Sequence, residues 1–255
     1  MSAFELSLPQ LAAVAGAFGV GGFVKGVVGL GLPTVSMGLL GLFLPPAQAA
    51  VLLLLPSFVT NLWQIGGWAP LQTALRRTWS LQVGVVIGTV FAPVGLATLD
   101  PRIGALGLGA ALLVYAVFGL AKLTLAVPLR WQPIASPLVG LATGAVTAAT
   151  GVFVFPAVPY LQGLGMDKER LVQAMGLSFG VSTLALGWRL AADGAVPALA
   201  WGDAASGLLP LAAALLGMGA GQWLRRRLSE ATFRRVFFAG IGAVALHLLL
   251  KGGLR

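Results

Sequence analysis

The residue of this chain best suited to bind a charged ligand is Lys25. It lies in the segment Gly21-Gly-Phe-Val-Lys25-Gly-Val-Val-Gly-Leu-Gly31, inside a long apolar stretch, with no acidic residue close to it in the sequence. A cation in such a stretch costs at least a few kcal/mol and usually faces a cavity or a partner. The segment therefore favours an anion site at Lys25, although a lysine near a helix end can also extend its ammonium group toward water.

Glycines are concentrated in two segments, 22–31 and 140–151, each followed closely by a proline. Small residues at this spacing allow close packing of two helices. They also suit a helix break, where free backbone N–H groups and the positive end of a helix dipole bind an anion. On that interpretation the candidate ligands are the amides of Gly29, Gly31 and Gly151 and the hydroxyls of Thr34, Thr147 and Thr150.

Polar side chains also follow each glycine segment, in two groups that each fit within about one helical turn: Ser57, Thr60 and Asn61, and Ser178, Ser182 and Thr183. Each group can line one helix face and bind the same ligand. Hydrogen bonds between helices, or to a carbonyl one turn back, are the alternative role for the serines and threonines. We include Asn61, Ser178 and Ser182 among the candidate substrate ligands.

Two further residues are weaker candidates. Arg189 could be a second cation at the site, but Asp193 follows four residues later and favours an anchor at a helix end. His247 is the only histidine, and without cysteines or a close acidic cluster it has no partners for a metal site, so we expect it to pack in the interior. No hydrolase motif and no P-loop occurs, so neither an enzyme nor a cofactor is predicted.

The composition shows which elements must position these residues. Hydrophobic residues make up 58% of the chain, charged residues 9%, and the mean hydropathy is +0.95. A soluble domain carries about 25% charged residues, and a chain in lipid needs helices or a closed barrel. Long apolar runs without alternation indicate helices. The net charge of +9 fits basic loops at a membrane surface and not a nucleic-acid partner.

The sequence therefore predicts a single all-α membrane domain with about eight hydrophobic segments: 11–44, 47–66, 79–99, 103–127, 134–166, 171–190, 201–224 and 233–250. Short polar or turn-forming breaks, such as Arg76-Arg77, are expected between them. The first and fifth segments would each be about 50 Å long as one helix, against a hydrocarbon core of about 30 Å. Each is therefore expected to be a broken or re-entrant element. No Lys or Arg precedes the first segment, so it is not expected to be a cleaved signal peptide.

The two long segments also resemble each other. A shift of 122 positions aligns Gly22 with Gly144 and Gly29 with Gly151, and it aligns Thr60-Asn61 with Ser182-Thr183. This similarity indicates an internal duplication with a first repeat at 1–128 and a second at 129–255.

Loop charge favours an inverted relation between the two repeats. If each long segment enters and returns, one side of the membrane holds most of the cations and only a few lie opposite, as the positive-inside rule requires. The cation-rich side then holds Arg76, Arg77, Lys122, Arg130, Lys168, Arg170, Arg225, Arg226, Arg227, Arg234 and Arg235, and the other side holds Arg102, Arg189, Lys251 and Arg255. Inverted repeats with broken helices are a recurring transporter plan, with the substrate bound near the midplane. A bound anion is therefore expected between the two glycine-rich breaks.

These motifs resemble those of a known family. Gly22-Phe-Val-Lys-Gly-Val-Val-Gly-Leu-Gly31 with Pro33 is similar to the first signature of the TauE/SafE sulfite exporters, and Gly140-Leu-Ala-Thr-Gly-Ala-Val-Thr-Ala-Ala-Thr-Gly151 with Val154-Phe-Pro156 is similar to the second. The resemblance implies a multi-pass permease of the bacterial inner membrane. Its substrate would be a small anion such as sulfite, thiosulfate or sulfoacetate. Threonines and alanines at 147–150 stand where the family often has glycines, so the substrate itself is left open.

Four alternatives remain from the sequence. The chain could be a membrane subunit that anchors or assembles partners without transporting, or a transporter of an organic anion without sulfur. An intramembrane enzyme would need convergent acids, bases or metal ligands, and the sequence offers almost none; a transporter of cations or lipids would rather have acidic residues in its spans. The direction of transport, the coupling ion and the oligomeric state, including a homodimer, are left open.

Overall fold

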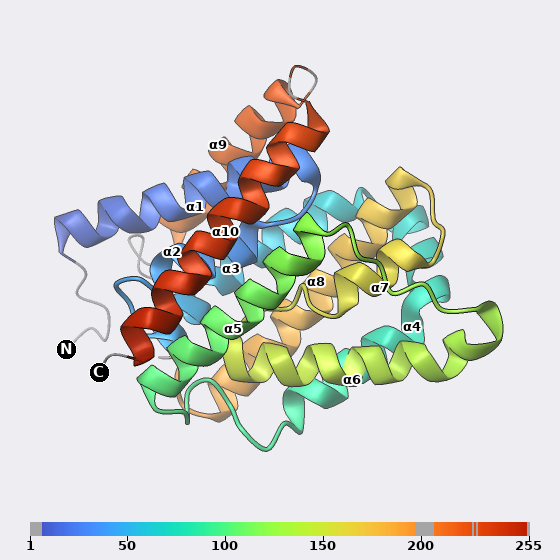
Figure 1. The fold of residues 1–255 in the computed structure, drawn as a ribbon, viewed down its shortest axis with the longest axis horizontal. Coiled ribbons are helices and arrows are strands. Elements are labelled where there is room, and N and C mark those ends of the chain that lie inside the picture. Colours follow the sequence, from blue (N-terminus) through green and yellow to red (C-terminus); the bar gives the residue numbers. More distant parts are fainter. Residues whose placement is uncertain (1–6, 197–206, 226, 228, 254–255) are drawn as a thin grey trace.

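The computed structural model describes residues 7–196, 207–225, 227 and 229–253, and these ranges fold into ten α-helices and one short 3₁₀ helix (Figure 1). The helices are α1 (Leu8–Val28), α2 (Leu32–Leu40), α3 (Pro46–Ile65), α4 (Trp68–Val90), α5 (Pro101–Leu120), η1 (Leu129–Trp131), α6 (Gln132–Thr150), α7 (Ala157–Gly163), α8 (Lys168–Ala192), α9 (Leu208–Leu224) and α10 (Glu230–Gly253). The predicted all-α architecture is confirmed.

Within the described ranges, six helical segments are long and apolar enough to cross a bilayer: Leu8–Val28, Pro46–Ile65, Pro101–Leu120, Leu129–Thr150, Lys168–Ala192 and Ala231–Gly253. A seventh apolar helix, α9, is shorter at 17 residues. The predicted segment that contains α9 begins at Trp201, which lies outside the described residues. Large apolar side chains such as Leu216, which is 76% exposed, cover the outer surface, as suits contact with lipid.

The expected break at Arg76-Arg77 is wrong. Helix α4 runs without interruption through both arginines, and the break lies earlier, at Gly66 and Gly67, which have left-handed φ angles of 80° and 143°. Arginine is a good helix former, and both side chains are exposed, so their charges are solvated without ending the helix. The chain instead turns where glycine permits a backbone conformation that other residues rarely adopt.

The first over-long segment is two helices that run back along each other. Helix α1 ends at Gly29, whose φ is 80°, and α2 begins after Gly31, whose φ is 115°. The Ser36 hydroxyl of α2 donates to the Ala17 carbonyl of α1 over 3.4 Å, and Leu32 lies against Gly21. Residue 32 thus contacts residue 21, and residue 36 contacts residue 17. The residue numbers rise along one helix while they fall along the other, so α2 is antiparallel to α1.

The fifth segment is interrupted in the same way. Helix α6 ends at Gly151, whose φ is 70°, and α7 follows after a short irregular stretch. The Tyr160 hydroxyl of α7 bonds to the Ser136 hydroxyl, in the first turns of α6, over 2.5 Å. The Leu125 amide, upstream of α6, donates to the Pro159 carbonyl over 2.9 Å. The chain therefore returns toward the start of α6.

Close helix packing through glycine joins α1 to α9. A Cβ placed on Gly22 would overlap the Ala214 carbonyl, and one on Gly26 would overlap the Met218 carbonyl. From α9, a Cβ on Gly217 would overlap the backbone of Gly19 in return. The close-packing interpretation of the first glycine segment is therefore confirmed for Gly22 and Gly26.

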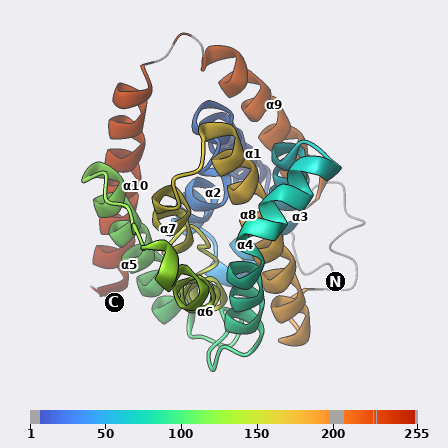
Figure 2. The same ribbon diagram turned by 90° about the vertical axis from the view of Figure 1, so that its right-hand side faces the viewer.

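Helices α4 and α6 form the matching seam (Figure 2). Here Gly140 and Gly144 approach the carbonyls of Leu81 and Val85 so closely that an added Cβ would overlap them. Helix α3 packs against α8, and α5 packs against α10, to complete the bundle. Helices far apart in the sequence thus form the main packing pairs.

The expected packing of His247 in the interior is wrong, because its side chain is exposed on α10. Helix α10 buries a stripe that includes Phe238, Ile241, Ala245 and Leu248, with the spacing of three and four residues that one helix face requires. Position 247 falls outside this stripe. Among the described residues, no group of three potential metal ligands occurs.

Candidate functional site

Lys25 lies in the last turns of α1 and is 3% exposed. Its ammonium group donates to the Thr60 hydroxyl over 3.1 Å and to the Asn61 side-chain oxygen, both on α3. Thr60 and Asn61 are fully buried. A long side chain that could reach toward water is thus held inside the protein, which rules out the alternative of a lysine extended to the surface.

The hydrogen bonds continue from α3 to α8. The Asn61 amide donates to the Ser57 hydroxyl over 3.2 Å, and Ser57 bonds to the Thr183 hydroxyl over 3.1 Å. Thr183 in turn donates to the Phe179 carbonyl over 2.7 Å. Lys25 is therefore the end of a buried polar chain that crosses three helices, with members on both sides of residue 128.

Gln64 is a member of this region that the sequence analysis missed. Its amide nitrogen donates to the Gly29 carbonyl and to the Val172 carbonyl, over 2.8 Å each, and so joins α3 to the end of α1 and to α8. Its side-chain oxygen is buried and unpaired. The signal was present, because Ser57, Thr60 and Gln64 recur at intervals of three and four residues and share one face of α3.

The electrostatics of the Lys25 site are unusual for a protein interior. Within the described part of the chain, no carboxylate forms an ion pair with Lys25. An ammonium group carries three donor hydrogens, and Thr60 and Asn61 take two of them. One donor therefore remains available, and a charge buried here without a counter-charge is costly.

Three other candidate residues are buried but make no hydrogen bond. The hydroxyls of Thr34, Ser178 and Ser182 have no partner, and all three side chains are fully buried. Buried polar groups are usually paired, so each of these hydroxyls can still donate to a ligand. Thr34 lies in the first turn of α2, three residues after Gly31, where the unpaired amides of a helix begin.

Four of the remaining candidates are already occupied, whereas the fifth, Gly31, turns the chain into α2 with a φ of 115°. The amides of Gly29 and Gly151 donate to the carbonyls of Lys25 and Thr147, over 2.8 Å each. The Thr147 and Thr150 hydroxyls donate to carbonyls one turn back, at 2.8 and 2.7 Å. None of these groups can donate to an oxyanion in this conformation, because its hydrogen is already used.

The two glycine-rich breaks lie against different parts of the protein. Gly29 lies against Val172 and Gln64, whereas Gly151 lies against Met37 and Leu96. The breaks differ in their neighbours because the two hairpins pack on different elements. The structure thus brings Lys25 and Asn61 together and leaves the Gly151 break outside their hydrogen-bonded cluster.

Arg189 does not join the cluster either. Its guanidinium donates to the carbonyls of Val90 and Ala92, over 3.1 and 2.8 Å, and pairs with Asp193 at 2.9 Å. Cations near the last carbonyls of a helix interact favourably with its dipole. Arg189 therefore fastens the end of α8 to the end of α4, in agreement with the anchor that Asp193 suggested.

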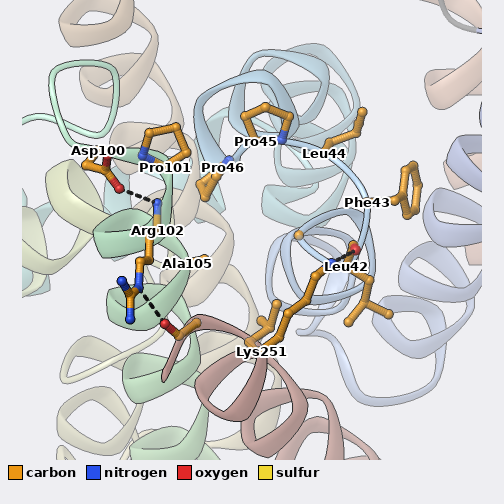
Figure 3. A pocket seen from close by; sticks show the side chains of 13 residues that line it. Leu42, Phe43, Leu44, Pro45, Pro46, Asp100, Pro101, Arg102, Ala105 and Lys251 are labelled. Carbon is orange, nitrogen blue, oxygen red and sulfur yellow. Dashed lines mark hydrogen bonds between the residues drawn. The ribbon is translucent and has the colours of Figure 1, made fainter. Parts of the chain in front are cut away.

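A cavity of about 460 Å³ lies elsewhere, between the start of α3, the start of α5 and the end of α10 (Figure 3). Two cations line it, but both are used in the fold. Arg102 donates to the Gly252 carbonyl over 2.6 Å, and Lys251 donates to the Leu42 carbonyl over 2.7 Å. These side chains tie α10 to α5 and to the loop before α3, so the cavity lacks the unpaired cation that distinguishes Lys25.

Comparison with known proteins agrees with this geometry. The sequence model of the family described as Sulfite exporter TauE/SafE matches residues 13–248. The chain therefore belongs to this family of membrane transporters, which carry small anions and are not enzymes. None of the curated proteins and none of the solved structures that were compared matches the chain.

Proposed function

We propose that this protein carries a sulfur oxyanion such as sulfite or thiosulfate, or an organosulfonate such as sulfoacetate, across the bacterial inner membrane, and that the anion binds at Lys25. The observation that supports this most is the buried ammonium group without a carboxylate partner. An anion at Lys25 supplies the missing counter-charge and accepts the remaining donor hydrogen. A bound sulfonate or sulfite group has several oxygens that can accept from neighbouring hydroxyls.

The similarity of the two halves indicates what each half contributes to the proposed site. Under the shift of 122 positions, Lys25 corresponds to Thr147, and Thr60 corresponds to Ser182. Thr147 is much shorter than lysine and bonds to its own helix, which leaves Ser182 without a partner. We infer that the first half contributes the charge and the second half contributes free hydroxyl donors.

The packing pairs support two inverted repeats, 1–128 and 129–255. A two-fold operation that exchanges α1 with α6, α3 with α8, α4 with α9 and α5 with α10 turns the α1–α9 pair into the α6–α4 pair. It maps the α3–α8 and α5–α10 pairs onto themselves and the extensive α4–α8 pair onto the smaller α9–α3 pair, and all of these pairs are in contact. The two break glycines also have similar backbone angles, with φ 80° and ψ 6° at Gly29 and φ 70° and ψ 6° at Gly151.

Contacts at the ends of the bundle support the membrane orientation. Arg102 and Lys251, which the charge pattern assigns to the cation-poor side, both contact the end of the bundle where α10 finishes. Gln64 joins the end of α3 to Gly29 and to the first turns of α8, at the opposite end. Lys25 is occluded from both ends, so release of the anion requires a rearrangement of the two halves.

The transport proposal predicts saturable flux. Purified protein in proteoliposomes is expected to carry at least one of sulfite, thiosulfate and sulfoacetate, measured with labelled anion against empty liposomes. A non-sulfur organic anion such as acetate is the comparison substrate. Saturable flux of acetate alone would move the substrate class away from sulfur. No flux of any anion by folded protein would favour a membrane subunit that assembles partners. A homodimer is a separate prediction for the same preparation.

The inverted topology predicts which loops share a side. The chain has no cysteine, so Arg76→Cys, Arg225→Cys and Lys251→Cys each introduce a single reactive thiol. In intact cells, a membrane-impermeant maleimide is expected to label Lys251→Cys, and to label the other two only after the membrane is opened. Labelling of Arg76→Cys and Arg225→Cys from opposite sides would contradict the hairpin arrangement.

A further inference from the structure

A second cavity, of about 190 Å³, is lined by residues at the end of α5, in the loop after it, in α7 and in α10. Figure 1 shows how these elements are arranged. Its polar lining includes Tyr115, Lys122, Thr124, Gln162 and Arg234. No Asp or Glu is among the described residues that line it. Since a water molecule takes about 30 Å³ in the liquid, the cavity has room for a tetrahedral oxyanion together with water.

Lys122 occupies a backbone position that normally requires glycine. Its φ is 56°, and it is the only residue other than glycine with a positive φ in the ranges that the structure describes. The Leu123 amide donates to the Phe118 carbonyl over 2.9 Å, so Lys122 is the left-handed residue that ends α5. Lysine there carries a conformational cost that glycine would avoid, and such strain is characteristic of functional positions.

Tyr115 points to a ligand independently of Lys122. Its side chain is 2% exposed and lines the cavity, and its hydroxyl has no hydrogen-bond partner. The ring of Phe238 packs edge-on against it at 5.1 Å between centroids, which fixes the direction of the phenol. A buried tyrosine usually finds a partner for its hydroxyl, so this donor is available to a molecule in the cavity.

The cations of this cavity also differ from Arg102 and Lys251, the two cations that line the larger cavity. No hydrogen bond or ion pair engages the side chain of Lys122 or Arg234 within the described part of the chain. Arg102 and Lys251, by contrast, both bind backbone carbonyls. The exposed Lys122, the half-buried Arg234 and the buried, unpaired phenol of Tyr115 therefore line one cavity, and each can donate to an anion there.

We propose that this cavity is a second anion site, separate from Lys25, which binds a phosphate-type or sulfate-type tetrahedral group through Tyr115, Lys122 and Arg234. The group is either a free oxyanion or the phosphate of a lipid headgroup. Both sources offer the same acceptors to the three donors. Because the site makes no use of Lys25, it does not depend on the proposed transport function.

The test is a thermal unfolding titration of the full chain, purified in detergent and stripped of lipid. The probes are inorganic phosphate, sulfate, a short-chain phosphatidic acid and a short-chain phosphatidylcholine, each against sodium chloride at equal ionic strength. We expect phosphate, sulfate or phosphatidic acid to raise the Tm in a saturable way. Tyr115→Phe and Lys122→Gly are each expected to weaken that binding about tenfold, the value of one hydrogen bond to a charged group. Arg130→Gln, an exposed cation outside the cavity, is the matched control.

The two variants also separate binding from a structural role. Lys122→Gly relieves the left-handed strain and Tyr115→Phe removes an unpaired hydroxyl, so neither should lower the Tm without ligand. A lower Tm in Tyr115→Phe would mean that the hydroxyl stabilises the fold, and would overturn the proposal. Unchanged affinity in both variants would place the bound anion outside this cavity and overturn the proposal as well. An effect of phosphatidic acid alone would identify the lipid source, and an effect of phosphate or sulfate the free ion.

Discussion

Lys25→Met is expected to reduce saturable anion flux about 10- to 150-fold while the protein remains folded. Loss of a hydrogen bond to a charged group costs about 1.5–3 kcal/mol, which corresponds to that range of affinity. Methionine fills a similar length of the space between α1 and α3. A buried charge without a counter-charge opposes folding. Without bound anion, the Tm of the variant is therefore expected to be equal to or above that of the wild type.

The matched control is Lys251→Met, the same substitution at a lysine that contacts the Leu42 carbonyl and is exposed. It is expected to retain flux. Both variants are measured in the same proteoliposomes, with their Tm and reconstituted amount determined first. Wild-type flux in Lys25→Met would show that the anion does not bind at Lys25. A strongly lowered Tm would instead assign Lys25 a structural role through Thr60 and Asn61.

Gly22→Ala is expected to destabilise the protein more than its single added methyl group suggests. A Cβ at this position overlaps the Ala214 backbone, which cannot move aside as a flexible side chain can. Helices α1 and α9 would have to separate, and overpacking of this kind costs about 1–3 kcal/mol. Gly140→Ala, in the seam between α4 and α6, is expected to behave in the same way. The measurement is the midpoint of thermal unfolding in detergent.

Gly16→Ala and Gly219→Ala provide the comparison on the same two helices. An added Cβ at either position meets nothing within 4 Å. Because alanine is a better helix former than glycine by about 1 kcal/mol, these variants are expected to be as stable as the wild type or more so. A Gly22→Ala variant as stable as Gly16→Ala would contradict the tight contact between α1 and α9.

Features set by local sequence were predicted well. The apolar runs indicated helices, and the excess length of two of them indicated the interruptions at Gly29 and Gly151. Glycine spacing indicated close packing, although not which helices would meet. Arg76-Arg77 was misinterpreted because charge alone was taken to end a helix, whereas the glycines at 66 and 67 end it through their backbone freedom.

The site was predicted less completely, since its contacts join positions far apart in the chain. Lys25 and Asn61 were identified as candidates separately, but their hydrogen bond follows from how α1 and α3 pack. Thr147 was expected to bind an oxyanion by its residue type. A threonine inside a helix can donate to the carbonyl one turn back, and the structure has that bond. Only tertiary structure distinguishes it from Ser182, whose hydroxyl is unpaired.

The pairing of α1 with α9 has a consequence for biosynthesis. About 180 residues separate the two helices, and at roughly 5–20 residues per second α9 emerges some 10–40 s after α1. During that interval the glycine face of α1 has no partner from its own chain. Insertion must therefore hold the first helix in a provisional state, with lipid or the insertion machinery against Gly22 and Gly26. Helix α9, in the last third of the chain, then completes the contact that the glycines of α1 make possible.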